Sequence, residues 1–529
     1  MDYDVIAIGS GFGGAITSCR LAEKGYKVLI LERGRRWDKT NYPRRPEDPW
    51  IWNHQHPESE NGWLDFRVFE NMAVAQGAAV GGGSLIYANI SCEPRADIFL
   101  KGWPKEITYS ELKPHYDQVA KFMNVKKVPV GQWPARTKLM QEAAKAIGKG
   151  DRFQQLDLAV SFDDNFNYDQ PDPHNPLKSR RFINDQGVEQ GYCVHLGNCD
   201  IGCDVDAKNT LDRNYIPWAE KYGAQVRPLH LVTNIEPVSG GYRVSYDELR
   251  GGDRASGSQT ARIVVVAAGS LGSTELLLKC RDLARSLPQI STRLGCGWSS
   301  NGDFLTPAFY PNRNVFPSRG PTITSAINFL DRSEGGESFW IQDGGFPDLL
   351  IDNLQVEKGK LDVTSPAQLL ITAIQGILQS TDPVKHVMPW FAQGVDAADG
   401  TLELKRPWWS FGFGKPSLHL AWDIAKSKAT IDAIVQMHER LAHATGGTPI
   451  VPITWTVDRF LITPHPLGGC NMGATASDGV VDHRGEVFGY RNLFVADAAI
   501  IPEALGVNPS RTIGALAERI AALIVADGR

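Results

Sequence analysis

The sequence has few cysteines, no excess of charge and no long apolar run. Its 529 residues include 8 cysteines, which favours a reducing compartment over an extracellular fold built on disulfides. Lysine and arginine number 55 against 60 aspartates and glutamates, a net charge of −5, and no basic run indicates a nucleic-acid surface. No stretch reaches the ~18 consecutive apolar residues that span a bilayer.

These absences predict a cytoplasmic globular protein with no nucleic-acid partner and no indicated membrane contact. Asp2 and the glycines that soon follow do not resemble a signal peptide, although a leader removed before Met1 stays open. The composition, 42% hydrophobic and 22% charged, is that of an ordinary globular protein. The length predicts roughly three to four domain-sized units, or fewer if one domain is large and interrupted.

The first residues predict a nucleotide-binding βαβ unit. A β-branched strand at residues 4–8 leads into a glycine-rich turn, a helix at 15–24 and a second buried strand at 27–31. A Gly-x-Gly-x-x-Gly turn lets the backbone approach a pyrophosphate at a helix amino terminus, and an acidic residue about 20 positions later can bind the ribose. We therefore predict a dinucleotide site that includes Gly9, Gly11, Phe12, Gly13, Gly14 and Glu32.

Two later segments favour FAD over NAD, which share the same ADP half. An apolar strand at residues 262–268 runs into Gly269 and a helix, and a strand near the carboxyl end finishes at Asp497. Both are typical of two-domain flavoproteins, where such an aspartate meets the ribityl and phosphate region. The prediction is FAD, with further contacts from a second glycine turn and these two strand ends: Gly81, Gly82, Gly83, Ser84, Ala268, Gly269 and Asp497.

The order of these segments predicts an α/β protein with a discontinuous, Rossmann-like FAD-binding domain and a mixed α+β substrate-binding domain. The FAD-binding domain is predicted from residues 1–110, 190–305 and 460–529, and the substrate domain from 111–189 and 306–459. The middle region is rich in Trp, Phe and Pro, which suggests an apolar pocket. Helices are expected at residues 109–124, 207–222, 366–380 and 509–525.

Five segments together resemble the glucose–methanol–choline (GMC) oxidoreductase family, and within it the cholesterol oxidase branch. They are residues 9–14 with Glu32, 81–85 followed by 93–94, 207–212, 264–273, and 465–470 through 506–509. The resemblance covers the flavin-binding half and is loose in the middle region. It implies FAD-dependent oxidation of an alcohol on a mostly apolar substrate, with Val232, Asn508 and Pro509 as further cofactor contacts.

Alcohol oxidation requires a hydride to leave carbon while a base takes the hydroxyl proton and a donor holds the oxygen. The resemblance assigns the base to His465 and the donor to Asn508. Asn508 followed by Pro509 is also a preferred N-cap pair for the last helix, so both roles stay open. A helix starting at Pro509 would direct its positive dipole end towards the flavin.

Two positions depart from the cholesterol oxidase pattern. Gln342 best matches the glutamate that moves the ring proton during steroid isomerisation, and an amide cannot act as that base. Asp343 could replace it only by a one-residue slip, which on a strand turns a side chain to the other face. Tyr87 stands where cholesterol oxidases carry a small Asn. We therefore expect little activity on steroids, with a true steroid oxidase as an alternative.

The expected partners are a small alcohol and dioxygen or another electron acceptor. Two further enzyme classes are compatible with a glycine-rich α/β scaffold. One is a flavin-dependent lyase or decarboxylase, and the other is a pyridine-nucleotide reductase, which would need a second nucleotide fingerprint and a close cysteine pair. Cys193, Cys199 and Cys203 are spaced five and three residues apart, which fits no common zinc pattern, so no metal is predicted.

Overall fold

A seven-stranded sheet forms one half of the molecule in the computed structural model, which describes residues 1–45, 47–348, 383–406, 414–456 and 459–528. Its strand order is β8-β2-β1-β11-β10-β9, with β21 paired to β11. The strands are β1 (Tyr3–Ile8), β2 (Val28–Leu31), β8 (Gln225–Arg227), β9 (His230–Val238), β10 (Gly241–Arg250), β11 (Asp253–Val266) and β21 (Leu493–Val495).

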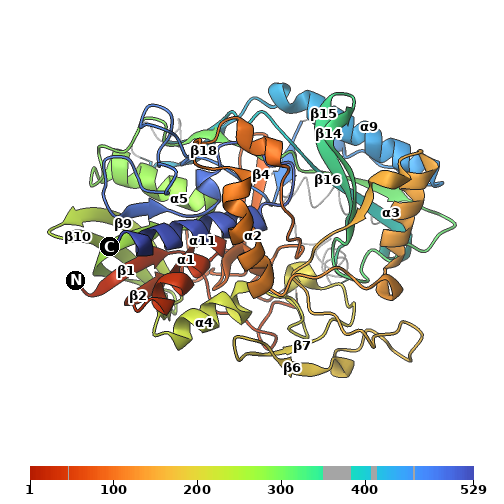
Figure 1. Cartoon of the computed structure of the whole chain (residues 1–529), viewed down its shortest axis with the longest axis horizontal. Helices are drawn as coiled ribbons and strands as arrows, with labels where there is room; N and C mark the ends of the chain where they lie inside the picture. Colours follow the sequence, from red (N-terminus) through yellow and green to blue (C-terminus); the bar gives the residue numbers. More distant parts are fainter. Residues whose placement is uncertain (46, 349–382, 407–413, 457–458, 529) are drawn as a thin grey trace.

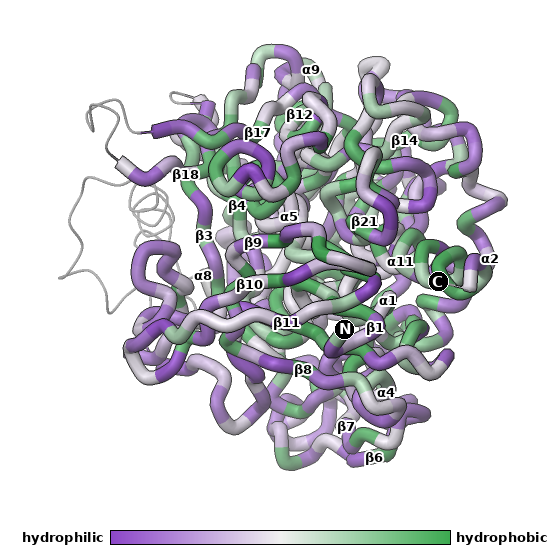
Figure 2. Tube along the Cα trace, turned by 90° about the vertical axis from the view of Figure 1, so that its left-hand side faces the viewer, coloured by the Kyte–Doolittle hydropathy of each residue, from purple (hydrophilic) through white to green (hydrophobic). Residues whose placement is uncertain are grey.

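The centre of this sheet is parallel and buried. β1 pairs in parallel with both β2 and β11, and β21 runs parallel to β11. These strands are apolar because helices cover them, as expected for parallel strands joined by crossovers. Helices α1 (Phe12–Glu23) and α11 (Ser510–Ala526) pack on one another beside the sheet (Figure 1). The tube around β1 and α1 is largely hydrophobic (Figure 2).

A six-stranded antiparallel sheet forms the other half, on the right in Figure 1. Its order is β19-β13-β16-β15-β14-β5. The long helix α9 (Lys428–Ala444) packs on this sheet through a buried face that includes Ile431, Ile434 and Leu441. The strands are β5 (Phe153–Gln155), β13 (Phe304–Phe309), β14 (Ser325–Glu334), β15 (Glu337–Asp343), β16 (Val387–Gly394) and β19 (Thr448–Pro449).

Three small sheets complete the described part of the chain, in the orders β20-β4-β3, β12-β17-β18 and β6-β7. Their strands are β3 (Leu64–Val68), β4 (Met72–Gly77), β6 (Arg181–Ile183), β7 (Glu189–Gly191), β12 (Cys296–Trp298), β17 (Gly400–Lys405), β18 (Ser417–Ala421) and β20 (Leu461–Thr463). The other α-helices of the described residues are α2 (Tyr109–Phe122), α3 (Ala135–Ala146), α4 (Tyr215–Lys221), α5 (Gly269–Leu278), α8 (Pro383–His386) and α10 (Ile453–Thr456).

The predicted fold class is confirmed, whereas one predicted helix is wrong in extent. Residues 207–222 hold only a short 3₁₀ turn, Leu211–Arg213, and α4. The stretch before them is extended because Asn209 N–H bonds to Ala159 O and the ammonium of Lys208 bonds to carbonyls on other segments. The helix expected at 366–380 lies outside the described residues.

The two large sheets draw on different parts of the chain. The strands of the seven-stranded sheet come from residues 3–31, 225–266 and 493–495, and those of the six-stranded sheet from 153–155 and 304–449. The exact domain boundaries stay predictions. Within the described residues, no helix is long and apolar enough to cross a membrane, and no group of three His, Cys, Asp or Glu side chains could hold a metal ion.

Candidate active site

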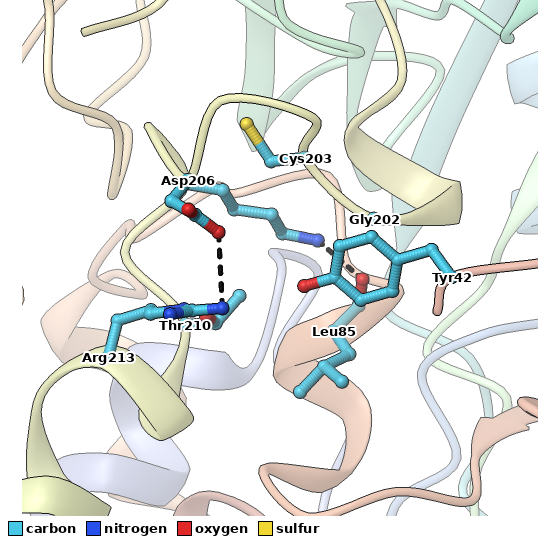
Figure 3. Close-up of a pocket in the computed structure, with 8 residues that line it drawn as sticks. Tyr42, Leu85, Gly202, Cys203, Asp206, Thr210 and Arg213 are labelled. Atoms are coloured by element: carbon cyan, nitrogen blue, oxygen red, sulfur yellow. Dashed lines mark hydrogen bonds and ion pairs between the residues drawn. The ribbon is translucent and has the colours of Figure 1, made fainter. Parts of the chain in front are cut away.

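A large cavity of about 620 Å³ runs between the two halves. Its wall includes the turn after β1, the ends of β2 and β11, and residues of the antiparallel half such as Leu305 and Phe391. The volume lies within the range of small-molecule and cofactor sites. A second cavity, beside Tyr42 and the Asp206–Arg213 ion pair, has about 10 Å³, room for about one water (Figure 3).

The glycines after β1 serve two different purposes. A Cβ on Gly13 would lie 1.9 Å from Ala496 O, and a Cβ on Gly14 would lie 2.0 Å from Gly9 O, so these positions let the helix approach the sheet. Gly11 differs, because its Cβ would meet only Gly82 Cα, at 3.9 Å, and would project into the large cavity. Gly9, Gly11 and Gly13 border the cavity, as does Phe12, whereas Gly14 does not.

The second glycine turn lies beside the first. Gly82 and Gly83 border the cavity, and a Cβ on Gly83 would meet nothing within 4 Å. Gly81 and Ser84 do not border the cavity. They shape the turn instead, since the Ser84 hydroxyl donates to Gly81 O at 2.7 Å and accepts from Leu211 N. Open space over two facing glycine turns suits a phosphate-bearing ligand approached by backbone.

Glu32 is buried at the end of β2 instead of being solvated. Its carboxylate accepts hydrogen bonds from the N–H and the hydroxyl of Ser10 and from Gly34 N, at 2.7–2.9 Å. It also borders the large cavity. Glu32 therefore ties the glycine turn to β2 and keeps a face towards any ligand in the cavity.

The late-strand residues gather on the same cavity. Val232, Ala268, Gly269, Pro509 and Asp497 all border it. The Asp497 carboxylate is occupied by Gly269 N, Ser273 Oγ and Ala499 N, at 2.5–2.8 Å, and burial raises its pKa. Asp497 thus holds the amino-terminal end of α5 against the cavity, and it also caps the short turn that follows it.

His465 lies at the cavity wall, and the partners of its two ring nitrogens determine which nitrogen carries the proton. Nδ1 lies 2.9 Å and 3.0 Å from the two carboxylate oxygens of Asp303, which is fully buried. Because a carboxylate only accepts, the proton belongs on Nδ1 and the lone pair on Nε2. Thr463 fixes the arrangement, since its hydroxyl lies 2.5 Å from Asp303 Oδ2 and accepts from His465 N.

Asn508 lies against the free nitrogen of this imidazole. Its Nδ2 is 3.3 Å from His465 Nε2, and its Oδ1 accepts from Gln342 Nε2 at 2.8 Å. The side chain therefore makes no cap hydrogen bond to α11, and Pro509 occupies the N-cap position. The predicted capping role of Asn508 is wrong, because its amide is held between Gln342 and His465.

Gln342 and Asp343 point to opposite sides of β15. Gln342 reaches Asn508, and its Oε1 is buried without a described partner. Asp343 forms a fully buried ion pair with Arg136 at 3.1 Å and accepts from Thr324 and Ser325. Asp343 thus serves the structure of the substrate half, and the position beside Asn508 carries the amide of Gln342.

Two functional candidates were missed by sequence reasoning. Asp303 has no motif of its own, and only the fold brings it to His465. Asn301 accepts from Leu505 N and Gly506 N and donates to Val507 O, so it holds the loop that carries Asn508. An isolated Asn-Gly-Asp before a strand gives no sequence signal for either role.

Comparisons with known proteins identify the family of this chain. A family model described as "GMC oxidoreductase" matches residues 396–517. A cholesterol oxidase from Acinetobacter baumannii is 31% identical over 546 residues, covering 99% of this chain and 95% of that protein. The chain belongs to the GMC oxidoreductase family. It is an FAD-dependent oxidoreductase, and the two glycine turns, with open space above Gly11 and Gly83, fit that cofactor.

Further relatives of this GMC oxidoreductase extend the comparison. A cholesterol oxidase from Mycobacterium tuberculosis (strain ATCC 25618 / H37Rv) is 32% identical over 549 residues, covering 99% of this chain and 91% of that protein. Among solved structures, an Aspergillus oryzae RIB40 formate oxidase variant superposes with a TM-score of 0.66 at 13% identity, covering 99% of this chain and 98% of that chain. The structural likeness supports the predicted fold.

Proposed function

We propose that this GMC oxidoreductase oxidises a hydroxyl group on a mostly apolar substrate, with His465 as the base. The observation that carries the proposal is the fixed tautomer of His465: Asp303 holds Nδ1, which leaves the Nε2 lone pair beside Asn508 at the cavity wall. When bound, FAD supplies the acceptor for the hydride. The substrate O–H bond breaks as its proton passes to Nε2.

The surroundings of His465 match the charges that develop in this step. The imidazolium formed by proton transfer lies against the Asp303 carboxylate, which stabilises it. Asn508 Nδ2 can donate to the substrate oxygen, because Gln342 occupies its Oδ1 and sets the orientation of the amide. The α11 amino terminus begins directly after Pro509 at the same wall, with no side-chain cap, and favours negative charge there.

The apolar substrate is supported by the cavity wall on the antiparallel half. That part of the wall includes Leu305, Ile323 and Phe391. Next to the glycine turns, Tyr87 also borders the cavity and packs against Phe12 with ring centroids 5.6 Å apart. Burial of apolar surface here provides binding energy without a charged anchor at the reacting carbon.

The cofactor contacts remain a proposal at the level of single residues. We assign the phosphate contacts to the glycine turns and the helix amino terminus at Gly11, and the ribose contact to Glu32, supported by their position around one cavity. Val232, Ala268, Gly269, Asp497, Asn508 and Pro509 complete the proposed set. Gly14, Gly81 and Ser84 shape the turns without bordering the cavity. The cytoplasmic location also remains a prediction.

The direct test is anaerobic mixing of the yellow, FAD-loaded protein with a panel of apolar primary and secondary alcohols. We expect the visible flavin absorbance to bleach with at least one of them, and readmission of dioxygen to distinguish an oxidase from a dehydrogenase. Bleaching by none of the alcohols, together with turnover of an added hydroxynitrile or carboxylic acid, would replace this proposal with a lyase or decarboxylase function.

A sterol alcohol is the second candidate, because the curated relatives at 31% and 32% identity are cholesterol oxidases. Against it, the position beside Asn508 carries the amide of Gln342. We expect little activity on a 3-hydroxy-5-ene steroid, with any product stopping at the unconjugated ketone. Conjugated-enone absorbance that rises as fast as the flavin bleaches would restore the steroid oxidase interpretation.

A further inference from the structure

A carboxyl group outside the catalytic set borders the same cavity. Asp200 lies in the 3₁₀ turn Cys199–Ile201, and it borders the cavity together with Thr322 of the antiparallel half. Protein atoms surround Asp200, yet part of its surface stays accessible because it faces the cavity space. Nothing in the alcohol chemistry at His465 uses this carboxyl group.

Asp200 has few hydrogen-bond partners for a partly buried carboxylate. Its one described hydrogen bond comes from the Thr322 hydroxyl at 3.2 Å, and no described cation lies within 4.0 Å to form an ion pair with it. A carboxylate offers about four acceptor positions, and leaving them empty away from water is costly. Burial raises the pKa of Asp200 to about 6, so the group is still mostly ionised at neutral pH.

Two cations whose charges act on Asp200 already have partners of their own. Lys208 donates to Leu85 O at 2.9 Å and to Cys199 O at 2.8 Å, beside the small cavity of Figure 3. Arg136 is paired with Asp343. Both cations lower the electrostatic cost of the Asp200 charge from a distance. A ligand group with a full positive charge would meet their repulsion, so a neutral hydrogen-bond donor fits the position better.

We propose that Asp200, steadied by Thr322, receives a second hydroxyl group of the substrate. The substrate class is then an apolar alcohol with two separated hydroxyl groups, one at His465 and the other donating its O–H to the Asp200 carboxylate. The inference rests on the proposed alcohol oxidation, and it names what that reaction selects. The carboxylate acts in binding alone, and no bond is made or broken at it.

The test compares α,ω-alkanediols with 1-alkanols of the same chain length, in a series of increasing length. Binding is measured by calorimetry and by thermal stabilisation, both on FAD-loaded His465→Ala protein, which keeps the ligand unreacted. At the chain length that matches the spacing of the two sites, we expect the diol to bind about tenfold more tightly, as a hydrogen bond to a charged acceptor allows.

Three variants locate the effect, each made in the His465→Ala background for both measurements. Asp200→Asn keeps the shape and removes the charge, so the preference for the diol should fall below about threefold. Thr322→Val leaves the carboxylate in place and should retain the preference. Asp204→Asn is the matched control, since Asp204 lies in the same segment, pairs with Arg44 and does not border either cavity.

The outcomes separate this inference from the proposed function. A preference that is absent at every length, or that survives Asp200→Asn undiminished, overturns the role of Asp200. A preference that depends on Asp200, in a protein whose flavin no alcohol reduces, leaves the hydroxyl site standing and removes the alcohol oxidation.

Discussion

The FAD-binding half and the substrate-binding half hold the same cavity by different means. On the FAD side, backbone segments pack directly on one another. Glycines let α1 approach the sheet closely, and they leave open space above Gly11. On the other side, buried polar side chains hold the wall, above all Arg136, whose guanidinium reaches Thr322 O, Asp343 and Gly344 O. A backbone site depends on local sequence, whereas a side-chain site depends on which strands the fold brings together.

The largest effect is expected where two backbones touch. Gly13→Ala would place a methyl group 1.9 Å from Ala496 O, so α1 must move away from the sheet and we expect no folded, yellow protein. Gly11→Ala is the matched variant, because its methyl group would enter the cavity and meet only Gly82 Cα at 3.9 Å. It should fold with near-normal secondary structure and lose FAD. Circular dichroism and flavin content measure the two effects; equal behaviour of the two variants would contradict the distinction.

In the substrate-binding half, we expect a large loss of stability when Arg136 is replaced. Arg136→Met removes one partner of a fully buried ion pair and leaves Asp343 uncompensated, at a cost of about 3–5 kcal/mol. Arg313→Met is the control, because the Arg313–Glu142 pair is exposed and should contribute at most about 1 kcal/mol. Thermal unfolding of the two holoproteins should show a much lower midpoint for the first. A similar midpoint for both would mean that the substrate half does not rely on this arginine.

The smallest effects are expected at Asn508. Asn508→Ala leaves the Gln342 amide without its acceptor, at a cost of about 1–3 kcal/mol, and removes the proposed donor to the substrate oxygen. Asn508→Asp keeps an acceptor for Gln342 but places negative charge where negative charge develops. We therefore expect Asn508→Asp to be the more stable variant and the slower one in anaerobic flavin reduction. The reverse order in both measurements would contradict the described orientation of this amide.

The same contrast explains what could be predicted from the sequence. The strand, glycine turn and helix after Tyr3, with Glu32, follow from neighbouring residues, and the family resemblance assigned His465 and Asn508. Asp303 could not be found, because 162 positions separate it from His465. The neighbouring Pro509 also predicted a cap role for Asn508. Local propensity takes no account of Gln342, which lies 166 positions away and binds the Asn508 amide.

We propose that Asp303 acts through His465, and a double-mutant cycle on anaerobic flavin reduction measures this dependence. His465→Ala should slow reduction by ~10²–10⁴-fold, the usual contribution of a positioned base, with FAD content unchanged. Asp303→Asn would donate to Nδ1 and move the imidazole proton to Nε2, so it should slow reduction by roughly 10²-fold on its own. In the His465→Ala background the same change should have almost no further effect. If the two factors instead multiply, Asp303 does not act by setting the state of His465, and the proposed catalytic pair is wrong.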